Sequence, residues 1–197
     1  TAFGLRNKFL FAFATFFALM AGALALSVAY LDRLGAGIDV ILVENQRSLS
    51  ACDGMELSLS ELERCTLHSV AWGAAHERGM REGLSSFIRF LTQQQQNITE
   101  PGEQERTAEL TALFQSLSNR VASLLAASGG PPPPRSWYQR ELGPGLAATR
   151  AAVDDIRSLN QAAMQRKSGT ARHLAATGRR AASLALLTGP LLLLLFY

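Results

Sequence analysis

A regular pattern of mostly small and apolar residues runs through the last part of the chain, from residue 146 to residue 197. Its spacing alternates between three and four residues, which is typical of a helix that packs in a supercoil against other helices. The register crosses Arg179 and Arg180 and enters an uncharged, leucine-rich run. We therefore predict one continuous helix that joins a water-soluble bundle to a membrane span. Its register positions are Leu146, Thr149, Val153, Ile156, Asn160, Ala163, Lys167, Thr170, Leu174, Thr177, Ala181 and Leu184.

A second uncharged run covers residues 9–31, near the start of the chain. As a helix it would be about 34 Å long, enough for the hydrocarbon core of a bilayer. A signal peptide is the alternative, because Arg6 and Lys8 precede the run and residues 23–25 resemble a cleavage site. We favour a retained membrane anchor, because the run is long for a signal peptide and another apolar run ends the sequence.

These two runs predict the placement of the chain in a membrane. Residues 1–8 carry basic and no acidic side chains, which favours a cytoplasmic N-terminus. Residues 9–31 form the first transmembrane helix, and residues 32–180 form a soluble segment on the other side. Residues 181–197 form a second transmembrane helix that is truncated, since it would be only about 25 Å long. We expect the sequence to be a fragment of a longer protein.

Three more amphipathic helices are predicted within residues 32–180. Each carries an apolar or small residue at helical spacing, with polar residues on the opposite side. The first has register positions Ile38, Ile41, Asn45, Ser48, Cys52, Met55, Leu59, Leu62 and Thr66, the second has Met80, Leu84, Phe87, Leu91 and Gln94, and the third has Leu110, Leu113, Leu117, Val121 and Leu124.

The connections between these helices contain helix-breaking residues. Gly73, Gly79 and Gly83 are expected to weaken the helix and permit a chain reversal. Residues 97–103 read as a helix-to-helix turn, with the proline in the first turn of the next helix. Residues 128–134 contain four consecutive prolines and predict a stiff, extended connector rather than a ligand for a signalling domain. Short connections make neighbours antiparallel, so we predict an all-α, antiparallel up-down four-helix bundle flanked by two transmembrane helices.

The charge distribution argues against a nucleic-acid partner. The chain has 19 basic and 16 acidic residues, and the acidic ones all lie between Asp32 and Asp155. Because two of the basic residues precede the first apolar run, the soluble segment is close to neutral. It shows no clustered basic face of the kind that nucleic-acid binding needs.

Candidate chemistry is scarce. His68, His76 and His173 lie outside any phosphoacceptor context and lack the helical spacing of a metal site. No phosphate-binding glycine loop occurs, so we expect no catalytic residue, metal or cofactor in this chain. Cys52 and Cys65 would lie about 20 Å apart on one helix, too far for a disulfide. We expect them in the core, and a bridge between subunits is the alternative.

Polar residues on the predicted helix seams are the candidates for a ligand site. Asn45 and Ser48 lie on the first helix and Asn160 lies on the fourth, while Glu44 and Arg47 are their neighbours. Polar residues at buried positions between packed helices often specify the register of the packing. The alternative is that these residues form a small ligand site. In such a site, Arg47 could hold a small anion through two hydrogen bonds, unless it pairs with Glu44 on one helical face.

Three separated segments resemble the KinB type of bacterial sensor histidine kinase. Residues 41–48 (ILVENQRS), followed by Met55, are similar to the start of its sensor bundle. Residues 97–103 (NITEPGE) are similar to the turn between its second and third sensor helices, and residues 159–164 (LNQAAM) to its fourth helix. The glycine-rich turn after the first helix and the proline-rich loop depart from the family pattern.

The resemblance implies a periplasmic four-helix sensor in the bacterial inner membrane. In that family the sensor is followed by a HAMP linker, a phosphoacceptor helix pair and an ATP-binding domain. We therefore expect a homodimer in the lipid bilayer that senses a small ligand or a periplasmic protein. A response regulator would be reached only through the kinase module. The alternatives are the sensor region of a methyl-accepting chemotaxis receptor and a plain structural membrane protein.

Overall fold

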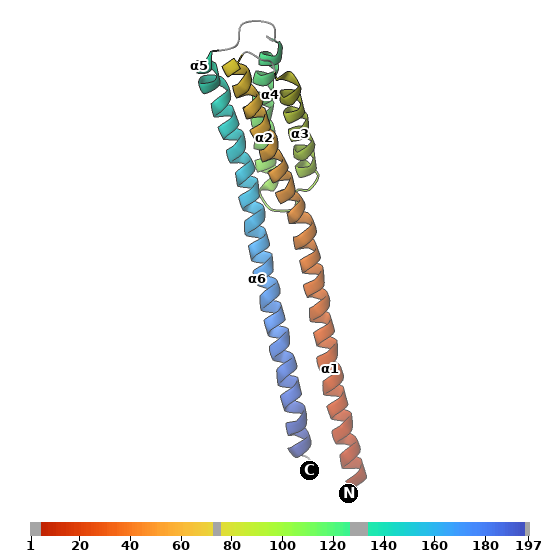
Figure 1. Cartoon of the computed structure of the whole chain (residues 1–197). Helices are drawn as coiled ribbons and strands as arrows, with labels where there is room; N and C mark the ends of the chain where they lie inside the picture. Colours follow the sequence, from red (N-terminus) through yellow and green to blue (C-terminus); the bar gives the residue numbers. More distant parts are fainter. Residues whose placement is uncertain (1–4, 73–75, 127–133, 196–197) are drawn as a thin grey trace. The chain divides into compact units, whose positions relative to one another are not determined.

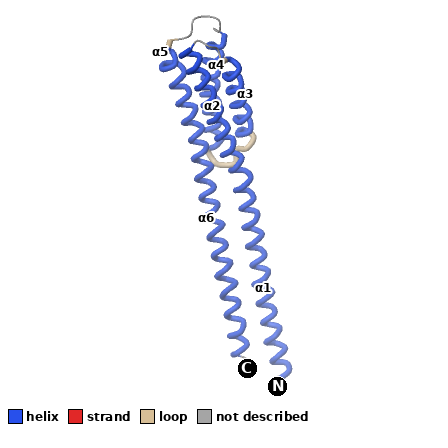
Figure 2. The backbone as a smooth tube through the Cα atoms, in the orientation of Figure 1, coloured by secondary structure: helices blue, strands red, loops and turns tan. Residues whose placement is uncertain are grey.

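A computed structural model describes residues 5–72, 76–126 and 134–195. Within these ranges the chain is helical and contains no β-strand (Figures 1 and 2). The long helices are α1 (Leu5–Val40), α2 (Gln46–Trp72), α3 (Glu77–Gln95), α4 (Glu103–Ala126) and α6 (Gly143–Leu195). The short segments are the π-helical η1 (Ile41–Asn45), α5 (Arg135–Trp137) and the π-helical η2 (Tyr138–Leu142).

The chain divides into two compact units. The first contains Thr1–Ile41 and Gln165–Tyr197, and the second contains Leu42–Met164. Helix α6 contributes to both units, because its helical backbone runs from Gly143 to Leu195 without interruption. The α1 and α2 helices are joined through η1 without a loop. The soluble segment expected at residues 32–180 thus extends beyond the second unit at both ends.

Four helices and η2 contribute to one hydrophobic core in the second unit. At its centre the rings of Phe87 and Phe114 are stacked, with centroids 3.9 Å apart. Burial of apolar surface of this kind is the main stabilising contribution to a helical unit. The buried apolar residues are Cys52, Met55, Leu59, Leu62, Cys65, Met80, Phe87, Leu91, Leu110, Phe114, Leu117, Val121, Leu125, Leu142, Leu146, Ala152, Val153 and Ile156.

The predicted register is confirmed on α2 and on the first part of α6. Each predicted position from Asn45 to Thr66, and from Leu146 to Ala163, is buried. The side chains of Ile38, Ile41 and Ala181 lie outside the described part. From Lys167 to Leu184, the described register positions are half-buried or exposed.

The apolar face of α4 differs slightly from the prediction. Phe114 and Leu125 are buried, whereas Leu113 and Leu124 are only partly buried against the core. The difference arises because the apolar stripe of a bundle helix is wide enough to include neighbouring positions. The stack on Phe87 selects Phe114 as the core residue.

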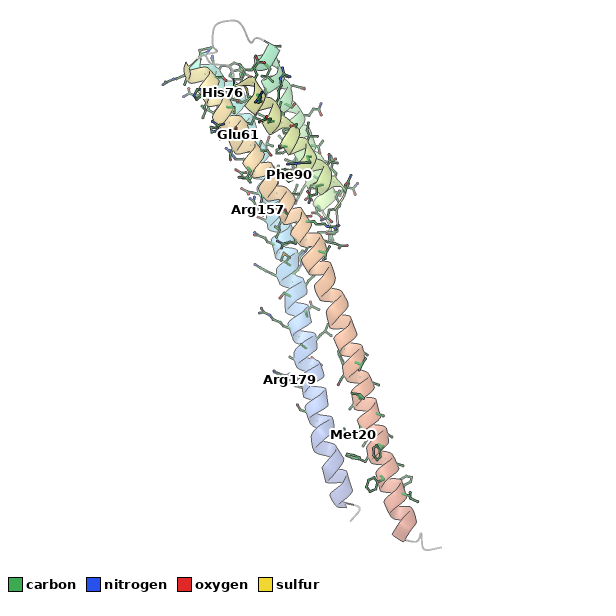
Figure 3. The ribbon with its side chains drawn as sticks, turned by 45° about the vertical axis from the view of Figure 1, so that its right-hand side comes forward. Met20, Glu61, His76, Phe90, Arg157 and Arg179 are labelled. Carbon is green, nitrogen blue, oxygen red and sulfur yellow. The ribbon has the colours of Figure 1, made fainter. Side chains whose placement is uncertain are left out.

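Glycines of α2 and α3 permit close helix packing and do not reverse the chain. Both Gly79 and Gly83 lie inside α3, which corrects the expectation that they form the turn. A Cβ at Gly79 would lie 2.4 Å from Cys65 Sγ, and one at Gly54 would lie 2.5 Å from the ring of Phe90 (Figure 3). The third predicted turn glycine, Gly73, lies outside the described residues.

The connection between α3 and α4 ends in a tight turn. The φ angle of Gly102 is +82°, and the N–H of Glu103 donates to the carbonyl of Glu100 over 3.1 Å. With Pro101 at the second position, these features define a type II turn. Since α4 begins at Glu103, Pro101 precedes the helix and is not in its first turn, contrary to the prediction. The proline-rich connector lies outside the described residues, except for Pro134, which is extended.

In the first unit, α1 and α6 approach each other at Tyr30 and Gly178. A Cβ at Gly178 would lie 3.6 Å from the ring of Tyr30. Among the described residues, one helical segment, Phe13–Tyr30, is long and apolar enough to cross a membrane, with a mean hydropathy of 1.9. Signal sequences share these properties, so both alternatives for this run stand. The second span, at residues 181–197, stays a prediction.

Candidate functional site: a buried polar cluster

A fully buried carboxylate lies at the start of α4, among polar side chains from the other helices. Glu103 has an exposed fraction of 0%. It directly follows the type II turn, which directs the chain so that this first helical residue faces the interior. Because a buried charge is costly unless it is hydrogen-bonded, the surroundings of Glu103 determine whether the fold is stable.

Three side chains donate to one oxygen of this carboxylate. The Oε1 atom of Glu103 accepts from Ser48 Oγ of α2 at 3.2 Å, Gln94 Nε2 of α3 at 2.7 Å and Asn160 Nδ2 of α6 at 2.8 Å. All three donor residues are themselves fully buried. One oxygen atom of α4 is therefore bonded to the other three helices of the second unit.

The other oxygen is bonded to the backbone of the α3–α4 connection. Oε2 of Glu103 accepts from the N–H groups of Thr99 at 2.8 Å and Glu100 at 3.0 Å. The Glu103 side chain thus pairs with two backbone N–H groups of the connection. Burial raises the pKa of Glu103, but hydrogen bonds from Asn160, Thr99, Glu100 and Gln94 outweigh burial and leave that pKa lowered.

A second set of hydrogen bonds attaches the connection to α2. The Asn97 amide donates to the backbone carbonyl of Glu44 at 2.6 Å and to Ser48 Oγ at 2.9 Å. The Thr99 hydroxyl donates to Asn45 Oδ1 over a longer 3.5 Å. We call Asn45, Ser48, Gln94, Asn97, Thr99, Glu103 and Asn160 the polar cluster.

Some buried polar atoms of this region have no hydrogen-bond partner among the described residues. They are Asn45 Nδ2, Gln94 Oε1, Thr107 Oγ1 and Asn160 Oδ1. Buried polar groups are usually paired, so these atoms offer unused hydrogen-bonding capacity within the core. The amide of Asn45 is the only donor group among them that belongs to a residue predicted as a ligand contact.

The structure brings together some of the five predicted ligand residues. Asn45, Ser48 and Asn160 are buried in the polar cluster. Glu44 contributes its backbone carbonyl, while Arg47 is exposed and, within the described residues, forms no salt bridge with Glu44. Arg47 points away because it lies about 200° around the helix from Asn45. Ligand binding by these five residues stays a prediction.

Sequence reasoning missed Asn97, Thr99 and Glu103 as members of the cluster. It placed Gln94 only on a helix face. From the sequence, Glu103 was interpreted only as an acidic residue that complements the positive end of a helix. The sequence carries no capping-box signal for Glu103, because the motif needs serine or threonine three residues earlier and Glu100 stands there. Nothing in the local sequence therefore indicates that the Glu103 side chain is buried.

Ion pairs also attach α6 to α2. Arg150 lies 2.9 Å from Glu56 and 2.8 Å from Glu63, and Arg157 lies 3.2 Å from Asp53. The hydroxyl of Tyr138 also donates to Glu63. Burial, together with this bond, raises the pKa of Tyr138 to about 12. These contacts fix α6 along α2 through partly exposed charges, which contribute less than buried bonds.

Cysteine and histidine side chains add no reactive centre to this unit. Cys52 and Cys65 are free and buried, as expected for core residues, and burial raises the pKa of Cys52 to about 12. A thiol with such a pKa is unreactive at neutral pH. The rings of His68 and His76 lie edge to face with centroids 4.1 Å apart. Among the described residues, no group of three or more potential ligands is placed to hold a metal ion.

No family model, curated protein or solved structure matches this chain. The resemblance to KinB-type kinases therefore rests on the three short segments described above. All three segments supply members of the polar cluster: residues 41–48 supply Asn45 and Ser48, residues 97–103 supply Asn97, Thr99 and Glu103, and residues 159–164 supply Asn160.

Proposed function

We propose that this chain is the signal-sensing and signal-transmitting region of a two-component sensor histidine kinase, whose catalytic module lies outside it. In this proposal, the second unit is the centre of an antiparallel up-down four-helix bundle. Residues 9–31 and 181–197 cross the bacterial inner membrane, and residues 32–180 lie in the periplasm. The working form is a homodimer in the lipid bilayer.

The observation that supports the proposal most is the shared carboxylate of α2 and α6. Ser48 on α2 and Asn160 on α6 both donate to Glu103 Oε1. In the proposal these are the two helices that continue into the membrane spans. A stimulus that alters the polar cluster would therefore act on both of them at once, without acting on the rest of the core.

Transmission would require only a small movement. Helix shifts of about 1–2 Å at packed interfaces are common in switching proteins. Helix α6 is continuous from Gly143 to Leu195, so a displacement at Asn160 is carried along its backbone. A small ligand or a periplasmic protein would supply the stimulus at Glu44, Asn45, Arg47, Ser48 and Asn160.

A register test addresses the transmission step. We would fuse the full chain to a kinase module and insert one residue after Ser168, which rotates the rest of α6 by about 100°. The matched control inserts seven residues at the same place, which returns the helix to within about 20° of its original phase. We expect the single insertion to change kinase output strongly and the seven-residue insertion to change it little. Equal output from both would contradict the proposal.

A further inference from the structure

The carboxylate of Glu103 is bound as a separate ligand would be bound. Its five hydrogen bonds come from residues outside its own helix, three from side chains and two from backbone N–H groups. Among the described residues no lysine or arginine pairs with it, so neutral donors alone compensate its charge. Hydrogen bonds from neutral donors to an ionised acceptor are short and strong, and a convergent set of them can bind a carboxylate.

Part of this donor set belongs to the surface of the second unit. The two N–H groups that bind Oε2 lie in the α3–α4 connection, where Ile98 and Thr99 are exposed. The three donors to Oε1 lie instead on packed helices. The exposed residues of the connection make this the side on which the proposal places the entry of a free carboxylate, although Glu100 and Glu103 are themselves buried.

The cluster also offers more donors than Glu103 uses. Asn45 Nδ2 is buried and has no hydrogen-bond partner among the described residues, although Asn45 Oδ1 is close to the Thr99 hydroxyl. The Asn45 residue has an exposed fraction of 0%. Glu103 leaves this donor unused, because both of its carboxylate oxygens accept from other groups.

We infer that the polar cluster is a receptor for a small carboxylate, in which Glu103 is the tethered occupant. A free monocarboxylate of the size of formate or acetate takes the same position when the Glu103 side chain is withdrawn. The inference names the ligand class of the proposed sensor site, and rests on the proposed function only for its consequence in signalling. Carboxylate binding itself depends on the donor geometry alone.

A free carboxylate must compete for the site with the Glu103 side chain, which is covalently attached to the protein. A tethered group has an effective concentration in the millimolar range or above, so a free carboxylate binds the natural chain only weakly. When it binds, Glu103 is displaced and its bonds to Ser48 of α2, Gln94 of α3 and Asn160 of α6 are broken. Occupation by a free ligand thus removes the direct bonds of this carboxylate to α2 and α6, while the apolar core still holds the helices together.

Chemical rescue tests the inference. In the full chain in detergent, Glu103→Ala removes the tethered carboxylate and leaves its five donors without their acceptor, which lowers the melting temperature. We expect sodium acetate or formate to recover about half or more of the lost shift, through binding to the folded state. Sodium chloride at equal ionic strength should recover little. No recovery beyond that in chloride would overturn the inference.

Two control variants separate the site from a general salt effect. Glu105→Ala removes an exposed carboxylate from the same helix and should show no acetate response beyond chloride. In the double variant with Gln94→Ala, one donor of the receptor is lost, so acetate rescue of Glu103→Ala should become much weaker. Equal rescue with and without Gln94 would overturn the inference.

If Glu103→Ala does not fold in chloride, recovery of folded protein during purification replaces the melt. Folding in acetate and not in chloride supports the receptor, and failure in both overturns it. The outcome is independent of the fusion experiment. Rescue by acetate with no effect of the single-residue insertion would leave the receptor and reject the transmission proposal, and the reverse result would reject only the receptor.

Discussion

Two layers of the second unit have buried centres but are stabilised in different ways. Around Phe87 and Phe114, apolar side chains fill space and exclude water. Around Glu103, polar side chains satisfy one charge through directional bonds. Apolar packing tolerates changes that preserve volume, whereas a hydrogen-bonded charge requires particular atoms at particular distances.

This difference assigns separate roles to the two layers. The apolar layer stabilises the association of the helices but would permit small axial shifts, since dispersion forces have little directionality. The polar cluster fixes the axial register, because a shift of one helical turn would separate Ser48 and Asn160 from Glu103. A buried polar residue that specifies register is well established in helical assemblies. Conservative substitutions in the two layers should therefore have unequal effects.

The largest effect is expected from Glu103→Gln. The substitution preserves shape but removes the charge and replaces one acceptor oxygen by a donor that faces other donors. We expect unfolding in urea to show a loss of about 3–5 kcal/mol. Glu105→Gln, on the exposed face of α4, should change stability by less than about 0.5 kcal/mol. Similar values for the two variants would contradict the role given to Glu103.

A smaller loss is expected from Gly102→Ala, which acts on the turn that positions Glu103. A Cβ at this position would meet nothing closer than Leu159 at 4.0 Å, so the cost arises from the positive φ angle. We expect a loss of about 2 kcal/mol in the same urea experiment. Gly145→Ala is the control, because that glycine lies within α6, where alanine should be neutral or stabilising.

Phe87→Leu should have a smaller effect, although Phe87 is among the largest fully buried side chains. Leucine keeps most of the apolar volume, and the core can adjust around it, so the expected loss is about 1 kcal/mol. Ile88→Val, at the exposed neighbouring position, provides the baseline in the same melt. If Phe87→Leu cost more than Glu103→Gln, the contrast between the two layers would be wrong.

A change of pH within the neutral range should have the smallest effect on the free energy of unfolding. The pKa of Glu103 is lowered in the folded state, so its contribution to stability is present above its unfolded pKa of about 4.3. This contribution is lost as pH falls through the folded pKa. The lowered pKa of Glu63 gives a slope of the same sign, so urea titrations of the natural chain and Glu103→Gln must be compared. A shallower acid slope in the variant is the expected result.

The sequence predicted the helices and much of the buried register, because helical periodicity is a local property. Asn45, Ser48 and Asn160 lie on that period and are all buried. Burial of Glu103 follows from the turn before it and from three helices that are distant in sequence. Helical periodicity does not indicate which distant helices contact a residue. An acidic residue at a helix start is also already explained by its favourable interaction with the helix dipole.

The same limit explains the glycines of α3. Their sequence spacing indicated only a weak helix, whereas their function depends on Cys65 and Ser58 of the helix alongside. Arg47 shows the opposite case. It adjoins Ser48 in sequence but lies about 200° around the helix from Asn45 and is exposed, so it is not a member of the buried cluster.

The π-helical segment η1 between α1 and α2 has a consequence for sequence evolution. A π turn closes its hydrogen bond over one residue more than an α turn, so Ile41–Asn45 holds one residue beyond what an α-helix would need. Deletion of one residue here could convert the turn to α-helix while both flanking helices keep their own sequence. Related chains are therefore expected to differ in length by one residue at this junction.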